Sequence, residues 1–321
     1  MRTQPSSTTS RPRGSLPRPA PRTTSALPWV ERGDNHLPPS IMGGVSRGMI
    51  SGKTGLLALV GQPVGHSLSP AMHNAAFVAD GLDFVYVCLD VDPDELPAAV
   101  RGLEALKFRG FNVTMPHKRA MIPLVDELEE EARISGAVNT VVIEASGLRG
   151  FNTDGGGMMM ACQEASIELS GKSVLLLGAG GTAAAIAVAF GKAGVGELHI
   201  ANRTVERATH LRDELHESGI KGLAVHHLDT LPDAEIVINA TPLGMKEGDP
   251  MPLPSGYVRE GRAFCDAVYR PGTETPLVRL ARERGFPVVA GDRMLLYQGV
   301  LAQKLWTGRE PNVKAMDRAI S

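Results

Sequence analysis

A short apolar segment, a glycine turn and an alanine-rich segment follow one another between residues 173 and 193, and they constrain the fold most strongly. The sequence there is SVLLLGAGGTAAAIAVAFGKA. Val174–Leu177 is an uninterrupted apolar run, which is typical of a buried parallel strand. Gly178, Gly180 and Ala183 then form the pattern G-x-G-x-x-A, before residues of high helix propensity. Strand, turn and helix in this order predict a Rossmann-type βαβ unit.

The glycine turn indicates a dinucleotide site. It lets backbone N–H groups approach a pyrophosphate, and the helix N-terminus adds positive partial charge. Glycines also form ordinary turns, so this pattern alone is weak evidence. Here it lies between the right elements, and we therefore expect a bound dinucleotide.

The end of the next predicted strand indicates which dinucleotide binds. Residues 197–201 form that strand, and Asn202 and Arg203 follow it, with Arg207 one turn later. An acidic residue at this place would favour NAD by binding the ribose 2′-hydroxyl. Guanidinium groups instead suit a 2′-phosphate. Two solvated arginines are the alternative interpretation, but a helix start is a poor place for cations. We expect NADP.

Composition excludes several classes of protein. The chain has 321 residues and a net charge of −2, so nothing in the bulk charge favours nucleic acid or a membrane surface. Cys88, Cys162 and Cys265 are isolated in sequence, which argues against a disulfide framework or a zinc site. No apolar run approaches the ~20 residues of a membrane span. We expect a cytoplasmic α/β enzyme that binds no metal.

Residues 1–52 differ from the rest of the chain. They are rich in Pro, Ser, Thr and Arg, and the first acidic residue is Glu31. We expect a disordered leader. It could be an organellar transit peptide, a disordered tail, or the result of start-site choice, because Met49 directly precedes a normal domain start. The last two are favoured, since no clear amphipathic arginine helix is present.

The remaining residues are expected to form two α/β domains and a helical end. Residues 53–155 are expected to bind substrate and carry the catalytic groups on a mostly parallel sheet. Its expected strands are 55–60, 83–89, 110–114, 137–144 and 148–152. Helices are expected at 93–107 and over much of 118–134. Residues 156–290 are expected to bind the dinucleotide. Residues 291–321 are expected to be helical and to pack back on the first domain.

Polar residues gather at the ends of the first-domain strands, where open α/β sheets bind ligands. Each has a structural alternative: a serine that caps a helix, an asparagine that satisfies backbone groups, a solvated lysine or an aspartate in a turn. Together they predict one polar cleft for a small hydroxylated carboxylate. The residues are Ser67, Ser69, Asn112, Thr114, Lys118, Asn139, Thr153 and Asp154.

Eight segments, in order, resemble the shikimate dehydrogenase family and its shikimate/quinate relatives: GQPVGHSLSPAMHNAAF, FNVTMPHK, GAVNT, GFNTDG, LLGAGG, NRTVERA, NATPLGM and GDRMLLYQGV…LWTG. The likeness covers residues from about Gly55 to Gly308. It implies reversible, NADPH-dependent reduction of 3-dehydroshikimate to shikimate, on the route to chorismate and the aromatic amino acids. It also implies a small-molecule partner, and a homodimer stays open.

The resemblance also assigns roles to individual residues. It implies that Lys118 and Asp154 form the catalytic pair. Substrate contacts are implied for Ser67, Ser69, Thr114, Asn139, Asp154, Tyr269 and Gln298. Cofactor contacts are implied for Gly178, Ala179, Gly180, Gly181, Thr182, Asn202, Arg203, Thr204, Arg207, Ala267 and Gly291, with Glu130 as a looser member of this group.

Alternatives and departures accompany this interpretation. A quinate or dual shikimate/quinate dehydrogenase is the nearest alternative, followed by a non-catalytic sensor on the same fold, which would be expected to lose the Lys–Asp pair. A Rossmann dehydrogenase with an unrelated substrate domain is disfavoured by the first-domain motifs. Gln303 stands where the family often has an aromatic residue, and Arg293 where small residues are common. Both leave substrate preference open.

Overall fold

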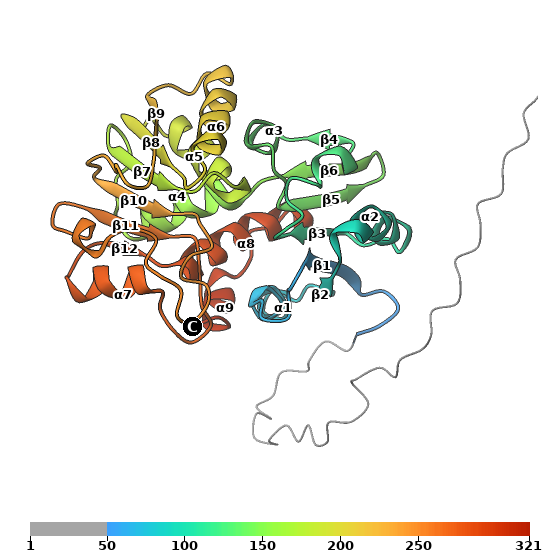
Figure 1. Ribbon diagram of the computed structural model, residues 1–321. Helices are drawn as coiled ribbons and strands as arrows, with labels where there is room; N and C mark the ends of the chain where they lie inside the picture. Colours follow the sequence, from blue (N-terminus) through green and yellow to red (C-terminus); the bar gives the residue numbers. More distant parts are fainter. Residues whose placement is uncertain (1–49) are drawn as a thin grey trace, which may run out of the picture. The chain divides into compact units, whose positions relative to one another are not determined.

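The computed structural model describes residues 50–321, which contain two six-stranded sheets (Figure 1). All but the last three residues of the expected leader lie outside the described residues. The predicted α/β class, with a Rossmann-like second sheet, is confirmed. The proposed domain boundaries stay a prediction.

The first sheet has the strand order β2-β1-β3-β5-β6-β4. Its strands are β1 (Gly55–Gly61), β2 (Phe84–Asp90), β3 (Gly110–Val113), β4 (Glu127–Leu128), β5 (Thr140–Glu144) and β6 (Gly147–Phe151). β1 pairs in parallel with β2 and β3, and β4 pairs in parallel with β6, whereas β5 runs antiparallel to both neighbours. A short turn joins β5 to β6, and such a connection permits only antiparallel pairing.

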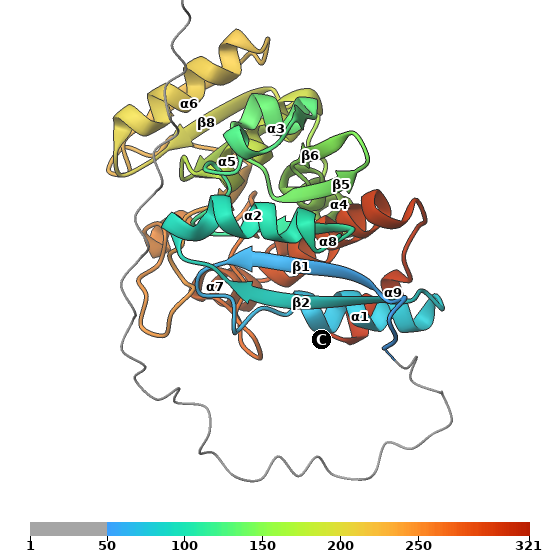
Figure 2. The same ribbon diagram turned by 90° about the vertical axis from the view of Figure 1, so that its right-hand side faces the viewer.

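Helices cover both faces of the first sheet (Figure 2). On one face, α2 (Leu96–Ala105) buries Leu96, Val100 and Leu103, which recur at helical spacing. On the other face lie α1 (Ser69–Ala79) and α8 (Gly291–Thr307), with the buried side chains of Phe77 and Trp306 against the sheet. Because helices cover both faces of the sheet, β1 is buried on both sides and its sequence is almost entirely apolar.

The second sheet is parallel throughout, with the order β12-β11-β10-β7-β8-β9. Its strands are β7 (Ser173–Leu177), β8 (Glu197–Ala201), β9 (Leu223–His226), β10 (Ile236–Asn239), β11 (Ala263–Asp266) and β12 (Val288–Val289), and α5 (Gly181–Lys192), α6 (Val205–Glu217) and α7 (Pro276–Glu283) are among its helices. The strand order reverses beside β7, so the glycine turn lies at the switch point where such sheets bind ligands.

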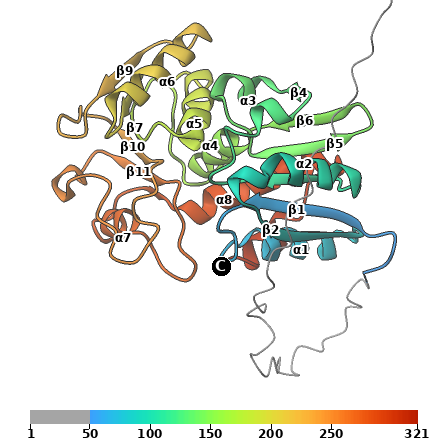
Figure 3. The same cartoon turned by 45° about the vertical axis from the view of Figure 1, so that its right-hand side comes forward.

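Helix α4 (Asp154–Glu164) packs closely between α5 and α8 (Figure 3). A Cβ added at Gly155 would lie 2.2 Å from the carbonyl oxygen of Ala185, and one at Gly157 would lie 2.6 Å from the amide nitrogen of Gln298. These glycines therefore allow close approach of neighbouring helices. The last helix, α9 (Val313–Arg318), packs on α1, which confirms that the helical end returns to the first domain.

One local prediction was wrong, and the helix cap considered as a structural alternative for Ser69 is not formed. Residues 118–129 form turns, a short 3-10 helix (Ile122–Leu124) and strand β4 rather than a helix, and only α3 (Glu130–Ser135) is α-helical in the expected span. Pro123 interrupts the span, and Met121 is buried in the core of the first sheet. Ser69 does not cap α1. It is the first residue of the helix, and its amide donates to Ser67 Oγ at 3.2 Å.

Neighbouring glycines of α4 give a matched test of helix packing. Gly157→Ala should lower the free energy of unfolding by about 1–3 kcal/mol, because the new methyl group meets the backbone of α8. In Gly156→Ala the methyl group meets only Leu301 Cδ1, at 2.8 Å, which can move. That variant should be neutral or more stable, because alanine favours helices. Urea unfolding measures both, and equal destabilisation would contradict this packing.

Candidate active site

A buried ion pair between Lys118 and Asp154 forms the centre of the candidate site. Lys118 lies in the loop after β3, and Asp154 begins α4. Their side chains are only 15% and 6% exposed, and Lys118 Nζ donates to Asp154 Oδ2. Thr182, in the first turn of α5, lies with Oγ1 3.0 Å from both atoms. Three separate segments therefore place one ammonium and one carboxylate together.

The N-terminus of α5 approaches the loop that contains Lys118. A Cβ added at Gly181 would lie 2.9 Å from Ala137 Cβ and 3.6 Å from Lys118 Cβ. The positive end of a helix disfavours a nearby ammonium. The carboxylate of Asp154 offsets this repulsion and the cost of burial. Glycine at position 181 thus brings the dinucleotide-type turn into contact with the predicted catalytic lysine.

Buried amide and hydroxyl groups connect to this pair. Asn139 Nδ2 donates to Asp154 Oδ1 at 2.7 Å and to Thr153 Oγ1 at 2.9 Å. Asn112 donates to the carbonyl of Asn139 and to Thr140 Oγ1. The side chain of Thr114, at the end of β3, is half-buried. The predicted polar residues of β3, β5 and α4 therefore do lie together.

Ser67, Ser69 and Tyr269 form a second polar group beside the loop that follows β1. Burial raises the pKa of Tyr269, and a hydrogen bond with Ser67 partly offsets this. Ser69 is 4% exposed. Tyr269 follows β11 of the second sheet, so the two sheets both contribute here. Gln298, on α8, donates from Nε2 to the Leu295 carbonyl at 2.9 Å.

Two residues near this group were not predicted from the sequence. Tyr86 and Cys88 lie on β2, and burial raises the pKa of both side chains. Hydrogen bonds with Ser69 and Ser67, respectively, oppose these shifts. Both residues occur in an apolar strand, so the pattern gave no signal beyond core packing. Only the parallel pairing of β2 with β1 places them next to the serine loop.

The glycine turn has the features that a dinucleotide requires. Gly178 has a φ of +113°, and a Cβ there would lie 2.9 Å from the carbonyl oxygen of Ala240. A Cβ at Gly180 would meet nothing within 4 Å, so space is open beside the turn. Arg203 and Arg207 are exposed, and among residues 50–321 neither makes an ion pair. Thr204 is the N-cap residue of α6, and Asn202 donates to its carbonyl.

Glu130 lies away from the other residues of the predicted cofactor group. It forms an ion pair with Lys192, the last residue of α5. The glycine turn lies at the opposite end of this twelve-residue helix. Because α-helices rise 1.5 Å per residue, the two ends are separated by roughly 16 Å. Glu130 therefore joins α3 to α5 and does not lie beside the glycine turn.

Arg293 and Gln303, the two residues that differ from the family pattern, both make side-chain contacts with other helices. Arg293 pairs with Glu164 of α4 and with Asp317 of α9, so it joins α8 to both helices. Gln303 is fully buried, and its Oε1 lies 2.9 Å from His73 Nδ1. Gln303 Nε2 and His73 Nε2 have no hydrogen-bond partner among residues 50–321.

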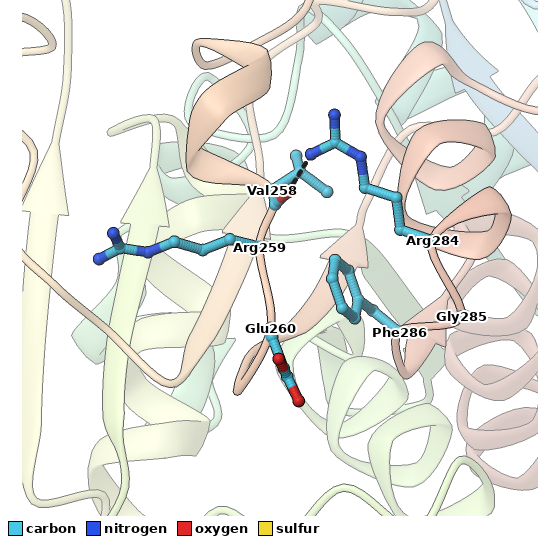
Figure 4. A pocket seen from close by; sticks show the side chains of 6 residues that line it. All are labelled: Val258, Arg259, Glu260, Arg284, Gly285 and Phe286. Atoms are coloured by element: carbon cyan, nitrogen blue, oxygen red, sulfur yellow. Dashed lines mark hydrogen bonds between the residues drawn. The ribbon is translucent and has the colours of Figure 1, made fainter.

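A surface pocket of the second sheet lies apart from the candidate site (Figure 4). Its residues precede β11 and β12, so it lies at the amino ends of these strands, whereas the glycine turn lies at a carboxyl end. Arg284 donates to the carbonyl of Val258 across this pocket. The lining residues are Val258, Arg259, Glu260, Arg284, Gly285 and Phe286.

Remaining titratable groups provide no metal centre in the described chain. Residues 50–321 contain no cluster of three or more His, Cys, Asp or Glu that could bind an ion. None of the helices in this range is long and apolar enough to cross a membrane.

Two pairs of side chains outside the candidate site lie close together. Cys162 and Cys265, far apart in sequence, lie with their Sγ atoms 3.8 Å apart. His199 Nδ1 lies 3.1 Å from His226 Nε2.

Three parts of the chain match models of one protein family. Residues 59–141 match the shikimate dehydrogenase substrate binding domain, residues 160–244 match shikimate / quinate 5-dehydrogenase, and residues 293–320 match the shikimate 5′-dehydrogenase C-terminal domain. A shikimate dehydrogenase (NADP(+)) of Rubrobacter xylanophilus is 58% identical over 278 residues, which are 85% of this chain and 97% of the relative. The chain belongs to the shikimate dehydrogenase family.

Solved shikimate dehydrogenase structures share this architecture. One, in complex with NADP+, has a TM-score of 0.81 and 41% identity, and the match covers 86% of this chain and 98% of that chain. Another, from Thermus thermophilus in complex with NADP(H) and shikimate, has a TM-score of 0.76 and 38% identity, with 83% and 98% covered. The resemblance seen in the sequence is confirmed.

Asp266, at the end of β11, should make stability depend on pH. Burial raises its pKa to about 7, despite hydrogen bonds from Thr275, Val268 and Asn239. The folded state therefore retains a proton that the unfolded chain releases near pH 4. This contribution to the free energy of unfolding is present below pH 4 and is lost as the pH rises to about 7, by about 1 kcal/mol per pH unit.

Asp266→Asn tests this titration. The free energy of unfolding of the wild-type chain, minus that of the variant, should decrease between pH 4 and 7 in urea titrations. The exposed Asp94→Asn serves as the control and should show no such trend. Parallel curves for wild type and Asp266→Asn would contradict a raised pKa at this carboxyl.

Proposed function

We propose that this chain catalyses the reversible, NADPH-dependent reduction of 3-dehydroshikimate to shikimate, as a step in the biosynthesis of chorismate and the aromatic amino acids. The observation that carries the proposal is the buried Lys118–Asp154 pair in contact with Thr182, directly after the glycine turn. An acid–base pair adjoins the dinucleotide site, as hydride transfer coupled to proton transfer requires. Family membership and the names of the relatives support the same activity.

Substrate binding is assigned to the two polar groups of the site. Ser67 and Ser69, with Tyr269, would bind the carboxylate, because their hydroxyls are donors in a partly buried place. Asn139 and Asp154 would bind ring hydroxyls, with Thr114 beside them and Gln298 contributed by α8. Donors at one end and a mixed amide–carboxylate group at the other suit a hydroxylated ring acid.

The residues of the glycine turn fit NADP. The turn 178–182 would bind the pyrophosphate through backbone N–H groups at the start of α5. Arg203 and Arg207 would bind the 2′-phosphate, with Asn202 and Thr204 beside them, because both guanidinium groups are exposed and without ion pairs in the described chain. Ala267 and Gly291 would border the nicotinamide.

Lys118 is assigned the proton transfer. Bound NADPH supplies the hydride for the substrate carbonyl carbon. Negative charge then develops on the carbonyl oxygen, where the Lys118 ammonium stabilises it and donates a proton. Asp154 orients the ammonium and keeps it beside the helix N-terminus. In the reverse direction Lys118 accepts the proton of the hydroxyl group.

The domain assignment and the cellular setting are part of this proposal. Residues 53–155 would bind substrate, 156–290 would bind NADP, and 291–321 would complete the first domain. We propose a cytoplasmic enzyme whose partners are its small-molecule ligands and a second copy of the chain, with no nucleic acid or membrane. Light scattering of the purified chain tests the homodimer.

Initial rates with four substrate and cofactor pairs test the proposed function. Shikimate with NADP should give a far higher kcat/KM than quinate with either cofactor or shikimate with NAD. Comparable turnover of quinate, above all with NAD, would instead support the quinate alternative. Cofactor binding without turnover of either acid would support a sensor.

Replacement of the proposed acid should stop chemistry without loss of the cofactor. We expect Lys118→Ala to lower kcat by about 10²-fold or more, the usual scale of general acid–base assistance, while the Kd for NADPH changes little. Steady-state rates and NADPH fluorescence measure these two quantities. The exposed Lys53→Ala is the control. A near-normal kcat for Lys118→Ala would remove this residue from the mechanism.

Cofactor preference should depend on the arginines after β8. Arg203→Ser and Arg207→Ser should each raise KM for NADP by about 10-fold or more, the value of a lost charge-assisted hydrogen bond, and leave KM for NAD nearly unchanged. Arg101→Ser, an exposed arginine of α2, should change neither constant. Equal effects on NADP and NAD would show that these arginines do not bind the 2′-phosphate.

A further inference from the structure

Tyr86 is a buried tyrosine of β2 whose hydroxyl faces the polar residues of the site. The side chain is 1% exposed, and its ring stacks on His73 with ring centroids 4.5 Å apart. The hydroxyl donates to Asn112 Oδ1 at 2.7 Å. Burial raises the pKa of Tyr86 well above its ordinary value, so the hydroxyl retains its proton and remains a donor.

The next hydrogen bonds fix the orientation of the Asn112 amide. Asn112 Nδ2 lies 3.1 Å from the carbonyl oxygen of Asn139 and 2.9 Å from Thr140 Oγ1. A carbonyl oxygen only accepts hydrogen bonds, so the NH₂ group must face it. Asn112 Oδ1 must then face Tyr86, and among residues 50–321 no other donor lies within hydrogen-bond distance of that oxygen.

The side chains of Thr140 and Asn139 continue this series of hydrogen bonds to the Asp154 carboxylate. Thr140 Oγ1 accepts from Asn112 and is therefore free to donate to Asn139 Oδ1, at 2.9 Å. The backbone amide of Thr153 also donates to Asn139 Oδ1, at 2.8 Å. The NH₂ group of Asn139 must consequently face Asp154 Oδ1, at 2.7 Å. Every donor in this series points toward Asp154.

We infer that Tyr86 is a positioning residue of the reaction, which acts through Asn112, Thr140 and Asn139 to orient the carboxylate of Asp154. This inference rests on the proposed function. With Oδ1 occupied by the Asn139 amide, Asp154 directs Oδ2 to Lys118 and Thr182. The series begins at Tyr86 because its hydroxyl satisfies the one amide oxygen that would otherwise be buried without a donor.

The alternative is that Tyr86 only fills the core between His73 and Trp306. Tyr86→Phe separates the two possibilities, because it retains the ring and removes the hydroxyl. A core role predicts a change in stability alone. A positioning role predicts a lower kcat as well, because small misplacements of catalytic groups are costly. Thr140→Val breaks the same series at a second place with little change of shape.

The test compares Tyr86→Phe, Thr140→Val, the double variant and a control. In Tyr257→Phe the lost hydroxyl donates to the Pro232 carbonyl in the second domain, so kcat should not change. We expect Tyr86→Phe and Thr140→Val each to lower kcat by about 10-fold, with the Kd for NADPH unchanged. The KM for shikimate should change less than kcat, because the series orients a group that acts on the reacting oxygen.

The double variant tests whether the two residues act in one series. It should lose about as much kcat as either single variant, whereas independent effects would multiply to about 100-fold. Multiplied effects, or a Tyr86→Phe enzyme with unchanged kcat, would overturn the inference. A wild-type chain that turns over no shikimate would instead refute the proposed function.

Discussion

The buried ion pair of Lys118 and Asp154 is the interaction on which the rest of the site depends. A buried ammonium is costly without a carboxylate partner, and the N-terminus of α5 beside it adds repulsion. Lys118 lies in the loop after β3 and Asp154 lies at the start of α4. Thr182 of α5 forms hydrogen bonds with both side chains. The hydrogen bonds of Thr182 form only when the start of α5 lies against the first sheet, so the complete group depends on how the two sheets are placed.

Glycines make that placement sterically feasible. Gly155 and Gly157 let α4 approach α5 and α8, and Gly181 lets the start of α5 approach Ala137 and Lys118. Side chains at these positions would separate the same elements that form the ion pair. Helix α8 also contacts the first sheet, and Arg293 joins it to α4 and α9. The helices around the two sheets thus share one packed interface.

Local patterns predicted much of this structure, and tertiary contacts explain what they missed. The glycine turn and the apolar runs of the second sheet depend on neighbouring residues, so they were visible in the sequence. The helix predicted after Lys118 does not form. Met121 is buried in the core of the first sheet and does not lie on the apolar face of a helix. Tyr86 was missed because a tyrosine in an apolar strand looks like a core residue until Asn112 is found beside its hydroxyl. The position of Glu130 could not be predicted, because the sequence does not show which end of α5 it contacts.

A crystal structure of the chain with NADP and shikimate would test the central claim most directly. The decisive quantity is the distance from Lys118 Nζ to the oxygen of the hydroxyl group that is oxidised. Our account predicts a hydrogen-bond distance of about 2.7–3.2 Å, with Asp154 still paired to the ammonium and the reacting carbon facing the nicotinamide. A different group or a water molecule at that oxygen, with Lys118 directed elsewhere, would contradict the assignment of Lys118 as the acid.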